Sequence, residues 1–262
     1  MRIQIVSGDD HESNNLTDKT LLALEKEFKK DGSVTLTAEN PDVIHIVGAW
    51  NKHAVRIAKQ AKTRHIAIVH SPLGSLSPWM QPSSKSTRLS AGMTTVVASG
   101  EMEKELLNET LHTTTKIILN CVVTQKSSAA LMTSLYKASY NEAINANDEA
   151  MWDDIERQVQ KLQPTAEVIG SVIKNILYAH KLYERRNIPQ VFLNQMAHLL
   201  ENSDFDEQLL GDILKTLRLL TFTGRLEYIM SETAGLGEGY MPVPHINDKL
   251  AEEMLALVTN YI

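Results

Sequence analysis

The stretch from Asp42 to Trp79 constrains the fold of this chain more than any other part of it. It reads DVIHIVGAWNKHAVRIAKQAKTRHIAIVHSPLGSLSPWM. Two apolar runs typical of buried strands, Val43–Val47 and Ile66–Val69, each lead into a turn of small residues, and a helical run, His53–Ala61, lies between them. This order predicts a strand, a crossover helix and a second, parallel strand. In open parallel sheets, ligands bind beside the loops that follow such strands.

The same alternation of strand and helix patterns extends over residues 1–124. It predicts an α/β fold, with a parallel Rossmann-like sheet flanked by helices. Residues 71–92 are rich in Ser and Pro and are predicted to form one long loop. The other predicted strands are 2–6, 34–36, 94–98 and 116–119, and the other predicted helices are 18–30 and 101–109.

Strand patterns stop near Ser127, and an all-α helical domain is predicted to follow. We therefore expect two domains, 1–124 and 125–262. Asp148 is read as a helix start, and Pro164 and Pro189 as breaks. The predicted helices are 128–145, 148–162, 165–186, 190–202, 205–222, 224–233 and 247–261.

Charge and composition exclude several functions. Residues 125–262 carry 12 Lys and Arg against 19 Asp and Glu, so this half is acidic and no nucleic-acid partner is expected. The single cysteine, Cys121, forms no intrachain disulfide. No apolar run approaches the roughly 20 residues of a transmembrane segment. Ser7–Asp10 interrupts the first apolar run too early for a signal peptide, so we expect a cytoplasmic protein, free or peripheral at the inner membrane face.

Several residues beside the predicted strand ends are candidates for contact with a ligand. His70 ends a strand and is the best candidate for a catalytic residue, as a general base or hydrogen-bond donor. His45 lies inside a strand and is expected to be a core residue. No His, Cys, Asp and Glu spacing matches a metal site, so no metal is expected. The predicted ligand-binding residues are Gly8, Gly48, Trp50, His70, Ser71, Gly74 and Trp79.

Four passages resemble the amino-terminal half of retaining GT-B-fold glycosyltransferases of the group 1, or family 4, type. Asp42–Trp50 (DVIHIVGAW) resembles the family pattern D-hydrophobic-hydrophobic-H-x-H-G-x-W, and Ile66–Trp79 (IAIVHSPLGSLSPW) resembles V-x-S-P-H-G-x-L-S-P-W. Thr94–Glu105 (TTVVASGEMEKE) resembles x-V-x-A-x-S-E-x-E, and Ile117–Thr124 (IILNCVVT) resembles the I-P-N-G-V-D linker. The resemblance implies the acceptor-side half of such an enzyme, with a nucleotide-sugar as donor and a sugar as acceptor.

The chain also departs from that family. The paired glycines after the first strand are reduced to Gly8, which is followed by Asp9 and Asp10, two carboxylates that repel phosphate. Val47 and Leu73 stand where the family has histidines. The second Rossmann-like domain is replaced by the helical region, in which no two glutamates lie eight positions apart as in the family's donor site.

These observations leave three readings of function open. The first is a glycosyltransferase-like protein of carbohydrate metabolism, truncated or divergent, whose donor-side groups come from the helical region or from another chain. The second is a pseudoenzyme that acts as a scaffold, with the acidic helical half forming a homodimer or docking a protein partner. The third is a small-molecule-binding module at the sheet edge. Whether the chain is an enzyme stays open at this stage.

Overall fold

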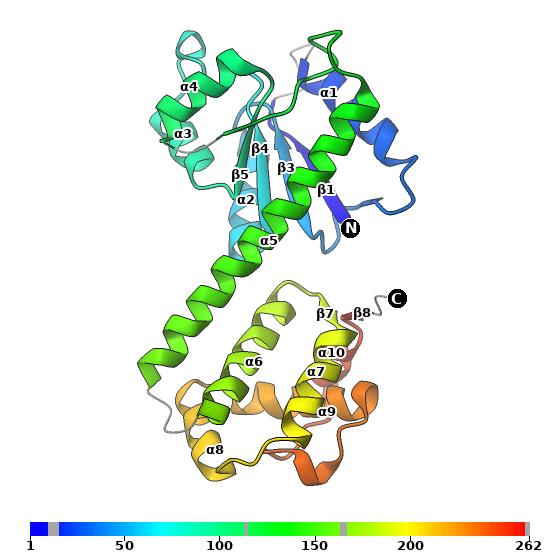
Figure 1. Ribbon diagram of the computed structural model, residues 1–262, viewed down its shortest axis with the longest axis vertical. Helices are drawn as coiled ribbons and strands as arrows, with labels where there is room; N and C mark the ends of the chain where they lie inside the picture. Colours follow the sequence, from blue (N-terminus) through cyan, green and yellow to red (C-terminus); the bar gives the residue numbers. More distant parts are fainter. Residues whose placement is uncertain (10–15, 113–114, 163–166, 260–262) are drawn as a thin grey trace. The chain divides into compact units, whose positions relative to one another are not determined.

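The computed structural model describes residues 1–9, 16–112, 115–162 and 167–259 (Figure 1). The chain divides into two compact units, Met1–Glu149 and Ala150–Ile262. The division falls inside helix α5 (Ala129–Leu162), whereas the sequence places the domain boundary after residue 124.

The first unit is built on a parallel sheet (Figure 1). In the described part of this unit, six strands pair in the order β2-β1-β3-β4-β5-β6, and every pairing is parallel. Ser7 pairs with Val47, and Val47 with Ser71, so the first, third and fourth strands end together. The strands are β1 (Arg2–Ser7), β2 (Thr35–Leu36), β3 (Val43–Val47), β4 (Ala67–Ser71), β5 (Thr95–Ala98) and β6 (Lys116–Ile117).

Helices cover both faces of this sheet, which explains why every residue of β3 and β4 is buried. One face packs against α1 (Leu16–Phe28) and the first part of α5, and the other packs against α2 (Lys52–Thr63). Successive residues of a strand point to opposite faces, so Val43 and Ile44 enter different cores. The α/β fold, the parallel sheet and its flanking helices are confirmed.

The second unit is mostly helical and surrounds its own apolar core. The core receives residues from the second part of α5, including Ile155 and Val159, and from the helices that follow. A short parallel pair, β7 (Ile188–Pro189) with β8 (Val258–Thr259), is also present, which the sequence did not predict. The helices are α6 (Glu167–Glu184), α7 (Gln190–Glu201), α8 (Glu207–Thr216), α9 (Leu220–Ala234) and α10 (Lys249–Leu255).

The prediction of one loop over residues 71–92 was wrong. This stretch contains a 3₁₀ turn, η1 (Pro78–Met80), and a helix, α3 (Ser84–Ala91). The helix is short and rich in Ser, so its apolar periodicity is weak. It begins at a good N-cap, because the Ser83 hydroxyl accepts a hydrogen bond from the Ser86 amide at 3.1 Å. Tertiary contact with α4 (Glu101–Leu111) further supports it.

Two predicted helix boundaries were also wrong. α5 continues through residues 146–147, so Asp148 does not begin a helix; this region holds neither Gly nor Pro to interrupt it. The predicted helix 205–222 is instead divided between α8 and α9, and Arg218 between them has a left-handed backbone with a φ of 59°. The predicted helix 247–261 was wrong as well, because α10 ends at Leu255 and Val258–Thr259 forms strand β8. Pro164 and the predicted helix start at 165 lie outside the described residues.

Candidate functional site

The strand order places a crevice beside the carboxyl ends of β1 and β3. The chain leaves β1 toward β2 on one side, while β3 and β4 continue the sheet on the other side. Ligands of open parallel sheets bind at such a reversal of strand order. A cavity of about 400 Å³ lies at this edge, within the range of small-molecule sites. Its lining residues are Gln4, Ile5, Val6, Ser7, Asp9, Asn51 and His53.

Asp9 and Asn51 are held in fixed positions in this cavity. Asp9 accepts a hydrogen bond from the Ala49 amide at 2.9 Å, and its other carboxylate oxygen accepts one from the Thr17 hydroxyl. Asn51 is the N-cap of α2, since its side-chain oxygen accepts from the Ala54 amide at 2.8 Å. The Asn51 amide group also donates to the Asp9 carbonyl at 3.3 Å. Both side chains are therefore oriented before any ligand arrives.

Two of the predicted glycines allow the loops of this edge to approach one another. Gly8 donates a backbone hydrogen bond to the Val47 carbonyl at 2.7 Å, and a Cβ at Gly8 would lie 1.7 Å from the Ala49 carbonyl oxygen. Gly48 has a φ of +93°, a conformation that favours glycine. Only glycine fits either position without a local rearrangement.

His70 is fully buried beneath Trp50. The two ring centroids lie 4.8 Å apart, and the Trp50 indole N–H donates to the Ser90 hydroxyl at 2.8 Å. His70 Nε2 lies 3.0 Å from the Gly48 carbonyl oxygen, which assigns the proton to Nε2 and leaves Nδ1 as an acceptor. Burial lowers the pKa of His70 to about 4, so the imidazole is neutral near pH 7. This geometry fastens the loop after β3 to β4.

Ser71 belongs to a buried polar network that joins the sheet to α5. Its hydroxyl lies 2.8 Å from His45 Nε2 and 2.9 Å from the Tyr136 hydroxyl, while the Tyr140 hydroxyl lies 2.7 Å from His45 Nδ1. All four side chains are buried. Burial lowers the pKa of His45 to about 3, so this ring is also neutral and offers one donor and one acceptor. His45 is thus the core residue that the sequence predicts.

Glu103, in the first turn of α4, fixes two further loops. One carboxylate oxygen accepts from the Gly74 amide at 2.6 Å. The other accepts from the Ser99 amide at 2.7 Å and from the Ser99 hydroxyl at 2.6 Å. Amides at the start of a helix are a common binding place for phosphate. Of the two amides that Glu103 binds, Ser99 lies just before α4 and Gly74 lies in the loop after β4, so a carboxylate of the chain itself takes the place that an anion could have at the start of α4.

The predicted ligand-binding residues therefore have different surroundings. At the sheet edge His70 contacts Gly48 and Trp50, and Gly8 packs against Val47 and Ala49, although none of the four predicted residues is among those that line the cavity. Ser71 faces the buried network and Gly74 contacts Glu103. Trp79 lies on η1 with 70% of its side chain exposed.

The sequence did not predict Asn51 and His53 as cavity residues. It identified Asp9 only as a negative charge that repels phosphate. The signal for Asn51 was present, because Asn directly before a helical run is a common N-cap. Asp10 lies outside the described residues.

Two further properties bear on function. No helix in the described ranges combines the length and apolar character needed to cross a membrane. Within the same ranges, no three His, Cys, Asp or Glu side chains come together as a metal site would require.

Comparisons of the chain with protein-family models, curated proteins and solved structures found no match.

Proposed function

We propose that the first unit binds a neutral, hydroxyl-rich ligand of the acceptor-sugar class in the cavity beside β1. In this proposal the chain is a glycosyltransferase-like protein related to the acceptor side of GT-B enzymes, and it does not transfer sugar alone. The observation that carries the proposal is the cavity of about 400 Å³ at the reversal of strand order, with Asp9 and Asn51 fixed in its wall.

The chemistry of the wall suits hydroxyl groups. Each carboxylate oxygen of Asp9 accepts one hydrogen bond from the protein and has a lone pair left for a ligand hydroxyl. Ser7, Asn51 and His53 add polar groups around it, and Val6, on the sheet face that α2 covers, supplies an apolar surface. A few fixed polar groups in a partly apolar cavity are typical of small-molecule sites.

The same charges disfavour an anionic ligand. Asp9 is one of the lining residues, and its negative charge repels an anion more strongly in a partly buried site than in water. The Glu103 carboxylate occupies the Gly74 and Ser99 amides that would otherwise be open to a phosphate. We therefore propose that a nucleotide-sugar donor, where one is used, is held by groups outside this cavity.

A binding titration separates these possibilities. Neutral mono- and disaccharides, nucleotide-sugars and free nucleotides would be titrated into the full chain while amide NMR signals are followed. We expect a neutral sugar to bind with a Kd of roughly 0.1–1 mM, or about −4 to −5.5 kcal/mol. Signals of Ser7, Asn51 and His53 should shift, whereas nucleotide-sugars should bind no better than their free sugars.

Asp9→Asn is the informative variant because it keeps an acceptor for the Ala49 amide and removes the charge. It should weaken sugar binding about tenfold, the effect of losing a charge-assisted hydrogen bond worth about 1.4 kcal/mol. Asp18→Asn is the matched control, since Asp18 is exposed on α1 and is not part of the cavity wall. Tighter binding of nucleotide-sugars than of neutral sugars would contradict the proposal.

The alternative is a non-catalytic scaffold, and one observation favours it. His70 and Ser71, two residues of the passage that resembles the glycosyltransferases, are both fully buried and contact the protein itself. If no sugar or nucleotide-sugar shifts any cavity signal, the scaffold reading replaces the first proposal. A partner protein, or a second copy of the chain at the acidic helical half, would then be the ligand to seek.

A further inference from the structure

A second site lies in the helical unit, on the face of α9 that carries Gly224. The Ile246 amide donates to the Gly224 carbonyl at 2.8 Å, and a Cβ at Gly224 would lie 2.7 Å from the Pro244 carbonyl oxygen. The segment 242–246 therefore lies closely against this helix. Glu227 follows Gly224 by three residues, a spacing that puts both on one face of α9.

Glu227 is a carboxylic acid buried beneath this segment. It is 0% exposed, and within the described chain neither of its carboxyl oxygens makes a hydrogen bond of ordinary geometry. The Val243 backbone amide faces the carboxyl and favours its charged form, but burial dominates and raises the pKa to about 9. A buried polar group without a partner costs about 1–3 kcal/mol of stability and calls for an explanation.

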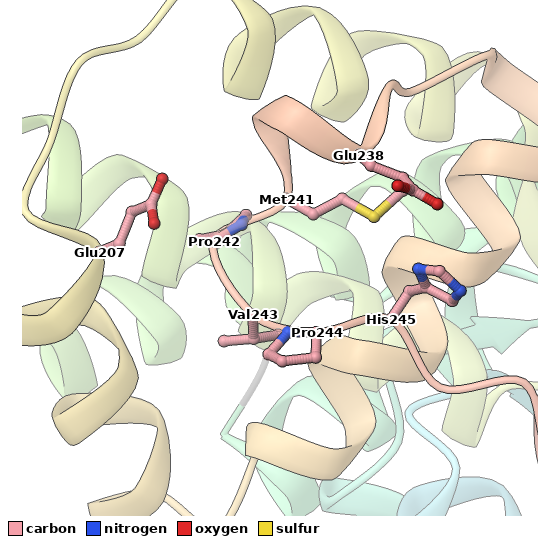
Figure 2. Close-up of a pocket in the computed structure, with 7 residues that line it drawn as sticks. All are labelled: Glu207, Glu238, Met241, Pro242, Val243, Pro244 and His245. Atoms are coloured by element: carbon pink, nitrogen blue, oxygen red, sulfur yellow. The ribbon is translucent and has the colours of Figure 1, made fainter.

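Above Val243 is a pocket of about 440 Å³ (Figure 2). Figure 2 shows Glu207 across the pocket from Glu238 and His245, with Pro242, Val243 and Pro244 between them. Met241 completes the wall, and no Lys or Arg is among the lining residues. The pocket thus has acidic sides and an apolar base, and the backbone amide of Val243 in that base faces the buried Glu227 carboxyl.

We propose that this pocket binds the primary ammonium group of an organic cation with an alkyl stem, and that Glu227 is its buried counter-charge. An ammonium group has three donors that can be shared among the surrounding carboxylates. Its methylene stem suits the Met241 and proline surfaces. Free alkylamines and lysine side chains of a protein partner share this chemistry. This site is separate from the sugar cavity and does not depend on the function proposed for that cavity.

Binding should be coupled to release of a proton from Glu227. A cation in the pocket favours the ionised carboxyl, while the negative charge of Glu207 opposes ionisation. The negative charge of Glu207 helps to raise the pKa of Glu227. The other charged or titratable side chains of α9 and of the elements around it are Arg225, Tyr228 and Glu232 of α9, His198 and Glu201 of α7, Asp212 and Lys215 of α8, Glu238, Tyr240 and His245 beside the pocket, Glu167, Lys174, Tyr178, His180, Lys181, Tyr183 and Glu184 of α6, and Asp248, Lys249, Glu252 and Glu253 at α10.

Calorimetry on the full chain tests the proposal with three probes: n-butylammonium, a lysine-containing hexapeptide, and the guanidinium analogue of butylammonium. Titrations in buffers of different ionisation enthalpy count the protons released. We expect butylammonium to bind and release close to one proton at pH 7. Glu227→Gln should weaken binding at least tenfold and abolish proton release, and Glu207→Gln should weaken binding by a smaller factor.

Glu232→Gln is the matched control, because Glu232 is an exposed acid on the same helix. Glu207 is exposed, so its variant tests the site even if Glu227→Gln perturbs folding. Tighter binding of the peptide than of butylammonium assigns the site to a protein partner, and the reverse assigns it to a free amine. No binding below about 10 mM, equal effects of all three variants, or tighter binding of the guanidinium probe would overturn the proposal.

Discussion

Acidification from pH 7.5 to pH 5 should destabilise the α/β unit by about 4 kcal/mol, because this unit buries two neutral histidines. His45 and His70 are both 0% exposed, and burial lowers their pKa values to about 3 and about 4. In the unfolded chain a histidine has a pKa of about 6.5. Below pH 6.5 the two histidines become protonated in the unfolded chain but stay neutral in the folded one. The stabilisation is therefore complete above pH 6.5 and is lost as the pH falls.

The magnitude follows from the unfolded state alone, since both folded pKa values lie below 5. At pH 5 each unfolded histidine is about 1.5 pH units below its pKa, which costs about 2 kcal/mol per histidine. No discount for solvent screening applies to side chains without exposed surface. Asp31 and Asp248 have lowered pKa values, so both carboxyls become protonated only below pH 5 and do not contribute between pH 5 and 7.5.

Hydrogen exchange of the β3 and β4 amides, measured from pH 5 to 7.5, reports the opening free energy of this unit separately. His45→Gln and His70→Gln should each remove about half of the pH dependence, whatever they do to stability at pH 7.5. His53→Gln changes an exposed histidine of the same unit and should leave the dependence intact. If neither His45→Gln nor His70→Gln reduces the dependence of the opening free energy on pH, burial of neutral imidazoles is not the cause of that dependence.

Three substitutions probe local contacts by urea unfolding. Gly8→Ala should lower the free energy of unfolding by about 3 kcal/mol or more, because the new Cβ would lie 1.7 Å from the Ala49 carbonyl oxygen. A loss of stability below about 1 kcal/mol would show that the loop can move to accommodate the Cβ. Tyr136→Phe removes one buried hydrogen bond, to Ser71, and should cost about 1 kcal/mol; no change would refute the network. Asp248→Ala removes the N-cap of α10 and also the carboxylate that accepts hydrogen bonds from Arg225 of α9, so it should cost about 1–2 kcal/mol, with faster hydrogen exchange in α10 and around Arg225.

Much of the α/β fold could be predicted because apolar runs and turn residues coincide there. The strand Val43–Val47 was predicted with its observed bounds, since Pro41 precedes it and Gly48 follows it. α3 was missed for the opposite reason. Its Ser, Lys and Thr residues give little apolar periodicity, and its stability comes from a cap and from α4. Periodicity also cannot show that two helical segments are continuous, as α5 demonstrates.

The site could be located from sequence only as far as the strand ends. Neighbouring residues of a strand point to opposite faces, so His70 faces Trp50 while Ser71 faces α5. Nothing local to β4 indicates which helix covers each face. The Tyr136 hydroxyl, which contacts Ser71, is 65 residues away from it in the sequence, and the Tyr140 hydroxyl is 95 residues away from His45. The cavity depends likewise on Asn51, whose role follows from the position at which α2 begins.

The two units should respond to pH in opposite directions near neutrality. Glu227 has a folded pKa raised to about 9, so the stability that its neutral form gives the helical unit is complete below about pH 4.5 and is lost as the pH rises. Between pH 7 and 8.5 the loss is about 1.4 kcal/mol per pH unit. The half-buried His180, whose pKa is lowered, acts only below pH 6.5 and does not alter this window. Trp152, stacked on Tyr178, reports the helical unit, whereas Trp50 and Trp79 lie in the α/β unit. An alkaline loss of stability at Trp152 that Glu227→Gln abolishes would therefore trace the cost to the buried Glu227 carboxyl, the group that a bound cation would stabilise in its charged form.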